Sequence, residues 1–254
     1  MIYMSKQLQS VPSLTNWLIE RQLEDKKNYQ WVVLSSFVIL LSQELLGITN
    51  DGIKSLLILD SNNIDVPMYI KEQQLIILSI EDTSYWCQVI YQLSHELCHM
   101  YIQKNSLETE EYLVWFEETL CEAFSYLVLE ECSKRWLKCE LSKVNSRYNA
   151  NITDYLRNLL QKKNGEKLSL CKTIEDLRII NSESERKRDE RAAERALIYH
   201  AMNKYLNDLP IILTYRKYIL PPEKLLIDFS SWKHSYPDNK LIGEMEKIQP
   251  KISC

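Results

Sequence analysis

Two of the four histidines in this 254-residue chain stand four positions apart, in the segment His95-Glu96-Leu97-Cys98-His99. Residues at positions i and i+4 lie on one face of an α-helix, so this spacing predicts a helix with both imidazoles on the same side. Imidazoles placed in this way can bind one metal ion, and the glutamate between them can reach a water on that metal. The motif therefore predicts a helix that carries His95 and His99 as metal ligands and Glu96 as a general base.

The residues before the motif fit a helix that follows a small sheet. Residues 63–70 and 75–80 are rich in branched and aromatic side chains, which is typical of strands. Residues 81–84 then supply side chains that can cap a helix, and from Trp86 onward apolar residues recur in one stripe at helical spacing. We therefore expect the motif on a helix that begins near Trp86.

A second predicted helix, rich in glutamate, follows the motif. A hydrolytic zinc site needs three protein ligands and one open position for water. Glu118 can supply the third ligand, and Glu117 and Glu122 are the alternatives nearby. Because Glu122 lies one turn after Glu118, it can instead accept the free N–H of a ligating histidine and fix its tautomer. Glu190 and Glu194 are more distant alternatives.

Eighteen residues separate His99 from Glu118, and Glu118 ends a W-F-E-E segment. This arrangement resembles the gluzincin clan of zinc metallopeptidases, and it is most similar to the aminopeptidase branch, whose pattern is H-E-x-x-H, eighteen residues and then E within W-L-N-E. An acidic residue four positions after the third ligand also recurs in the clan, and Glu122 matches it. The resemblance covers about residues 60–130 and lacks a G-x-M-E-N segment, so it implies the clan without that branch's amino-terminal specificity.

A site of this kind predicts a zinc-dependent metallopeptidase that holds one zinc ion and cleaves a peptide or protein substrate. Glu96 would take the proton of the zinc-bound water, and one further donor would stabilise the oxyanion. His200 and Tyr199 lead the candidates for that donor, because both lie on a predicted helix. The other candidates are Tyr205, His234 and Tyr236. An extended substrate would pair with a strand edge, for which residues 66–70 are the expected place.

Two other functions remain open at this point. The chain can be a binding or regulatory module that keeps the fold, and even the zinc, without hydrolysis. It can also be a helical interaction protein in which the motif is accidental. The net charge of −4 gives no reason to expect nucleic acid as the main partner, and the sequence makes no prediction about the oligomeric state.

Cysteine content and hydropathy favour a cytoplasmic protein. The seven cysteines are odd in number and form no C-x-x-C pair, which is typical of a reduced, intracellular chain. Cys98 and Cys121 lie near the candidate ligands, and core packing is the favoured role for both. Residues 31–48 are the most apolar segment, but they include polar residues and are short for a membrane span. We therefore expect a buried helix there, no association with membranes and no secretory signal.

The low glycine content favours helices. Four glycines in 254 residues, against a usual share of about 7%, leave few tight turns. We expect an α+β fold, predominantly helical, in which a small sheet packs on the helix that carries the motif. Residues 1–141 are expected to form a zinc-peptidase-like catalytic region, and residues 142–254 a helical C-terminal region, either separate or part of the same domain.

Local patterns predict the remaining elements. Residues 182–185 match a capping box, which predicts a long helix that ends near residue 207. The mixed charges of residues 185–191 predict a solvated, ion-paired face. Other expected elements are helices at residues 11–27, 30–46, 109–136 and 154–163, a short helix that opens at residues 173–176, a strand at residues 56–59 and a turn at residues 50–52.

Overall fold

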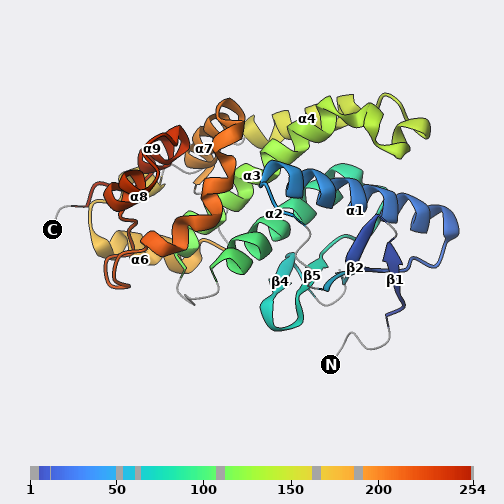
Figure 1. The fold of residues 1–254 in the computed structure, drawn as a ribbon, viewed down its shortest axis with the longest axis horizontal. Helices are drawn as coiled ribbons and strands as arrows, with labels where there is room; N and C mark the ends of the chain where they lie inside the picture. Colours follow the sequence, from blue (N-terminus) through green and yellow to red (C-terminus); the bar gives the residue numbers. More distant parts are fainter. Residues whose placement is uncertain are drawn as a thin grey trace. The chain divides into compact units, whose positions relative to one another are not determined.

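The structure, a computed structural model, has a predominantly helical α+β fold with one small mixed sheet (Figure 1). This confirms the predicted fold class. The structure describes residues 6–11, 13–49, 54–60, 64–106, 112–161, 167–185 and 191–252. The predicted turn at residues 50–52 lies outside the described residues.

Five strands form the sheet, in the order β1-β2-β3-β5-β4. The strands are β1 (Leu8–Val11), β2 (Leu14–Glu20), β3 (Ser55–Leu59), β4 (Met68–Ile70) and β5 (Leu75–Leu78). Strands β2, β3 and β5 run parallel, whereas β1 and β4 pair antiparallel at the two ends. All four residues of β5 are buried, as expected for an inner parallel strand. Strand β4, in the segment predicted to pair with substrate, is an edge strand of this sheet.

The helix predicted at residues 11–27 is wrong, because β1 ends and β2 lies within that range. Leu14 and Trp17 are three residues apart, which imitates a helix, whereas Trp17 and Ile19 are two apart, as in a strand. All three side chains are buried. Parallel pairing with β3 makes this segment a strand and not a helix. The pairing sets Ile19 opposite Leu57, and both side chains are fully buried.

Helices make up most of the chain. The α-helices are α1 (Asp25–Leu45), α2 (Trp86–Asn105), α3 (Val114–Lys134), α4 (Tyr148–Gln161), α5 (Lys167–Leu170), α6 (Ile174–Glu183), α7 (Ala192–Lys204), α8 (Phe229–Ser235) and α9 (Lys240–Glu246). The 3-10 helices are η2 (Lys71–Gln73), η3 (Trp136–Lys138), η4 (Glu140–Lys143) and η6 (Leu206–Tyr218). Among the described residues, no helix combines the length and the hydrophobicity needed to cross a membrane.

Most of the predicted helices are confirmed, with changes at their ends. Helix α1 contains the predicted residues 30–46 except the last, and it stops before Gly47, whose φ of 64° lies in the left-handed region that favours glycine. Helix α3 begins at Val114, later than the predicted residue 109. The prediction at residues 154–163 corresponds to α4, which begins six residues earlier, at Tyr148.

The chain divides into two compact units. Unit 1 comprises residues 1–100 and 128–156, and unit 2 comprises residues 101–127 and 157–254. The division falls inside α2 and α3, so it does not coincide with the predicted boundary after residue 141. A polar stretch in the sequence can mark only a continuous domain, whereas a compact unit can be assembled from separate segments.

In unit 1, helix α1 and the first part of α2 are joined to the sheet (Figure 1). The indole N–H of Trp31 donates to the carbonyl of Glu20 at the end of β2, at 3.0 Å. The Gln92 amide accepts from the N–H of Ser79 at 3.0 Å and donates to its carbonyl at 3.1 Å. Gln92 stands one turn before His95, so this pair of hydrogen bonds fixes the motif helix against the residue that follows β5.

In unit 2, helices α7, α8, α9 and η6 pack on one another (Figure 1). The start of α3 is held by the C-terminal segments, because the fully buried Trp115 donates its indole N–H to the carbonyl of Leu225 at 3.0 Å. The end of α2 is held in the same way, since the Asn105 amide donates to the carbonyl of Leu213 at 2.8 Å. The C-terminal half thus positions the helix segments on either side of residues 107–111.

The capping box predicted at residues 182–185 is wrong. Ser182 lies inside α6, where its hydroxyl donates to the carbonyl of Ile179 at 2.8 Å, and α7 begins only at Ala192. The capping box instead opens α6, which confirms the short helix predicted there. The Thr173 hydroxyl accepts from the N–H of Asp176 at 3.2 Å, and the Asp176 carboxylate accepts from the N–H of Thr173 at 3.0 Å.

Replacing Thr173 with alanine is therefore expected to lower the free energy of unfolding by about 1 kcal/mol, the usual cost of losing a side chain that caps a helix. Ser182→Ala is the matched control and should change it by less than about 0.5 kcal/mol, as at most surface positions. Urea denaturation followed by circular dichroism measures both variants. A larger loss for Ser182→Ala than for Thr173→Ala would contradict the observed start of α6.

Candidate metal centre

His95 and His99 lie on α2, and Glu118 lies on α3. Each offers one ligand atom, and the three atoms all lie within 4.8 Å of one another. The Nε2 atoms of the two histidines are 3.2 Å apart. Two ligands bound to a tetrahedral zinc at 2.0–2.1 Å are about 3.3 Å apart, so the spacing of the imidazoles suits a shared ion. A hydrogen bond between the two rings would give a similar distance, so the third residue is what distinguishes a metal site from a pair of hydrogen-bonded histidines.

The three residues fit a zinc ion by their chemistry and their burial. Two imidazole nitrogens and one carboxylate oxygen form a donor set of catalytic zinc sites, in which the fourth position is open to water. His95 and Glu118 are 1% and 7% exposed, whereas His99 is partly exposed. A buried carboxylate beside two imidazoles is costly without a cation or a proton to balance it, and a zinc ion supplies that balance.

Glu96 lies next to this cluster. Its side chain is buried, and its Oε1 atom is 3.9 Å from Nε2 of His95. A carboxylate at this distance can accept a hydrogen bond from a water that shares an ion with His95. The structure thus brings together the three residues that the sequence predicted as metal ligands and places Glu96, the predicted general base, next to them.

The two alternative glutamates of α3 are engaged by arginines. Both oxygens of Glu117 accept from Arg216, at 2.9 and 2.8 Å. The oxygens of Glu122 accept from Arg191 at 3.3 Å and from Arg195 at 2.6 Å. Among the described residues, the group that could hold a metal ion consists of His95, His99 and Glu118. The contact predicted between Glu122 and a ligating histidine stays a prediction.

The two leading candidates for the oxyanion donor lie on α7, as predicted. Tyr199 is buried, and its ring meets that of Tyr126 on α3, with the centroids 6.0 Å apart. Tyr126 is eight residues beyond Glu118, which corresponds to roughly 12 Å along the axis of α3. His200 is exposed, with its ring 4.9 Å from that of Tyr199. These contacts do not bring Tyr199 or His200 to the cluster, and their role stays a prediction.

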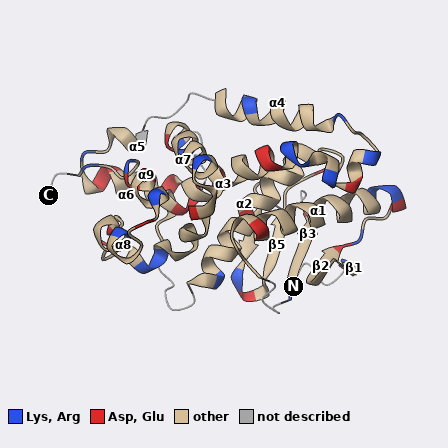
Figure 2. Ribbon diagram, turned by 45° about the horizontal axis from the view of Figure 1, so that its top comes forward, with Lys and Arg blue, Asp and Glu red and all other residues tan. Residues whose placement is uncertain are grey.

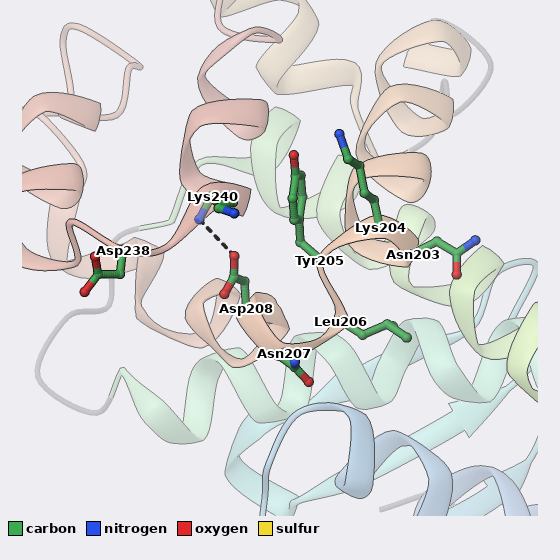
Figure 3. A pocket seen from close by; sticks show the side chains of 8 residues that line it. All are labelled: Asn203, Lys204, Tyr205, Leu206, Asn207, Asp208, Asp238 and Lys240. Carbon is green, nitrogen blue, oxygen red and sulfur yellow. Dashed lines mark hydrogen bonds between the residues drawn. The ribbon is translucent and has the colours of Figure 1, made fainter.

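Tyr205, His234 and Tyr236 are the lower-ranked candidates for the oxyanion donor. Tyr205 lines a pocket of unit 2 at the junction of α7 and η6, where the ammonium of Lys204 lies 4.9 Å from its ring centroid (Figure 3). The lining has two lysines and two aspartates, one of which, Asp208, accepts from the backbone N–H of Lys240 at 2.9 Å. This balance of charge favours no ionic ligand. His234 and Tyr236 are exposed, and Glu190 lies outside the described residues.

Other predictions concern two cysteines next to the candidate ligands in the sequence and the more distant Glu194. Cys98 and Cys121 are fully buried, as expected for side chains that pack in the core. None of the described cysteines forms a disulfide. Glu194 is buried on α7, and its burial raises the pKa of its carboxyl above the ordinary value.

Sequence reasoning missed the arginines that bind α3. The run at residues 185–191 was predicted to be solvated, which is wrong at Arg191, because its side chain is fully buried. Arg195 and Arg216 are also buried, and Tyr215 donates its hydroxyl to Glu117. A surplus of glutamates on a helix that is otherwise apolar is the one signal in the sequence that such partners were needed.

Comparisons of the chain with protein-family models, with curated proteins and with solved structures gave no match. The resemblance to the gluzincin clan therefore rests on the motif and its spacing.

Proposed function

We propose that this chain is a zinc-dependent metallopeptidase in which His95, His99 and Glu118 hold one zinc ion. The observation that supports the proposal is the convergence of their three ligand atoms within 4.8 Å, beside the buried carboxylate of Glu96. When bound, zinc would lower the pKa of its water to about 7 and polarise the carbonyl of the scissile peptide bond. This chemistry hydrolyses amides at neutral pH.

Glu96 acts as the general base in this proposal. Its carboxylate accepts the proton of the attacking water and passes it to the amine that leaves. Glu96 is 3% exposed, and a site with little water strengthens the interaction between the carboxylate and the charges that develop next to it. Tyr199 is not included as the oxyanion donor, because its ring contacts Tyr126, which lies roughly 12 Å beyond Glu118 along the axis of α3.

The substrate class in this proposal is an extended peptide or protein segment. Strand β4 ends the sheet, and its residues Met68, Tyr69 and Ile70 are partly exposed. An extended peptide can add to such an edge through backbone hydrogen bonds, which orient it independently of its sequence. Unit 1 contains both this edge and Glu96.

Removal and return of the metal test the proposal. The zinc-loaded chain is expected to cleave members of a mixture of synthetic peptides, with the products identified by mass spectrometry. Dialysis against a chelator should abolish cleavage, and stoichiometric zinc should restore it, because the fourth position on the metal supplies the water. His234→Ala, which removes an exposed histidine that is not one of the three clustered residues, is the control and should cleave as the wild type does.

The same experiment separates the other functions. A chain that binds zinc but cleaves none of the peptides would be the binding or regulatory module, and hydrolysis would be rejected. A chain that binds no zinc would make the motif accidental.

A further inference from the structure

Helix α3 holds three buried glutamates within six residues. Glu117, Glu118 and Glu122 are 2%, 7% and 0% exposed. Each buried carboxylate costs several kcal/mol unless it has a partner of opposite charge, and three on one helix repel one another. Glu118 and Glu122 also share a face, because they are four residues apart. Of these three carboxylates, it is Glu118 that lies within 4.8 Å of the histidine nitrogens as part of the cluster.

Glu117 is held by the end of η6. The guanidinium of Arg216 donates to both oxygens, and the hydroxyl of Tyr215 donates to one of them. Burial and the charge of Glu117 raise the pKa of Tyr215 well above its ordinary value, so the hydroxyl keeps its proton and stays a donor. Burial alone would lower the pKa of Arg216, but the hydrogen bonds to Glu117 and the negative charge of that carboxylate together outweigh this effect and raise it.

Glu122 is held by the start of α7. Arg191 and Arg195 each donate to a different oxygen of the carboxylate, and all three side chains are at most 3% exposed. Arg191 also donates to the carbonyl of Ser184 at 3.1 Å, and Arg195 lies over the ring of Tyr126. The ion pairs join α3 to the start of α7. Figure 2 marks acidic and basic residues along the ribbon of both helices. For Glu122 to bind a metal, two buried arginines would lose their partner, which is a large penalty.

We infer that the arginines of α7 and η6 select the third metal ligand, because they hold Glu122 and Glu117 and so leave the metal to Glu118. The inference rests on the proposed function, since it needs a metal at His95 and His99. Arg195 and Arg191 are positioning residues that act through Glu122. Removal of their charge should allow Glu122, on the same face as Glu118, to bind the metal in its place.

Zinc affinity in the absence of Glu118 tests this inference. Glu118→Ala in the full chain should bind zinc more weakly than the wild type, measured by competition with a chelating dye. Adding Arg195→Met should raise the affinity again, by about tenfold or more, the scale on which residues behind a metal ligand act. Arg195→Lys in place of Arg195→Met is the matched control and should give no increase, because it keeps the cation that holds Glu122.

Two further variants make the result decisive. Glu122→Ala, added to the variant with Glu118→Ala and Arg195→Met, should remove the regained affinity, and the visible spectrum of bound cobalt should change with it. Arg191→Met replaces Arg195→Met if the latter does not fold, and the same gain is expected. Equal zinc affinity with and without the arginine substitution, in folded variants, would overturn the inference. A wild type that binds no zinc would instead overturn the proposed function.

Discussion

Glu96→Gln is expected to keep its zinc and to lose peptide cleavage by about 10²–10⁴-fold, the usual contribution of a general base. Glutamine has the size of glutamate but does not take a proton from water at neutral pH. Glu96 is not one of the three residues whose ligand atoms cluster, so the metal should remain. Cleavage rate and zinc content, measured on the same preparation, give the two results.

Glu81→Gln is the control for this substitution. Glu81 is exposed and precedes α2, so the same chemical change there should leave both cleavage and zinc unchanged. Cleavage by Glu96→Gln at the wild-type rate would remove Glu96 from the mechanism. Loss of zinc in that variant would mean that Glu96 holds the metal.

Glu117→Ala is expected to lower the free energy of unfolding by about 3–5 kcal/mol, since it leaves a buried guanidinium without its partner. Arg216 is 6% exposed and donates two hydrogen bonds to Glu117, and Tyr215 donates a third. Chemical denaturation of the chain without zinc measures this loss separately from any effect on metal binding.

Glu130→Ala on the same helix is the matched control. Glu130 forms an ion pair with Lys134 at 3.0 Å, and both side chains are partly exposed, so the loss should be about 0.3–0.5 kcal/mol. Glu117→Met combined with Arg216→Met should cost less than Glu117→Ala alone, because no buried charge remains unpaired. Similar losses for Glu117→Ala and Glu130→Ala would contradict the buried ion pair.

Much of the fold follows from local patterns in the sequence. Long apolar stretches at helical spacing predicted α1, α2 and α3, because each helix buries a continuous set of side chains. The seven residues of β2 were misread, since Leu14 and Trp17 match helical spacing whereas Trp17 and Ile19 match the spacing of a strand. Pairing with β3, more than thirty positions further along the chain, decides their structure, and no local pattern contains that information.

The residues of the candidate site also fall into two groups: those that a local pattern predicts and those that only the fold brings together. His95, Glu96 and His99 follow from one turn of a helix, and Glu118 follows from the resemblance in spacing. The partners of the neighbouring glutamates do not, because Arg216 stands 99 residues from Glu117 in the sequence. Only the fold brings such residues together. Residue type and a place on a predicted helix favoured His200 and Tyr199 as oxyanion donors, but neither property carries information about distance from the metal ligands.

Zinc content is the most direct test of the central claim. The chain is incubated with zinc, freed of excess metal by gel filtration and analysed for metal per chain. We expect about one zinc in the wild type and in His234→Ala, and almost none when His95→Ala and His99→Ala are combined, because two of three ligands are then lost. A wild type without zinc, or a doubly substituted chain that retains it, would contradict a metal site at His95, His99 and Glu118.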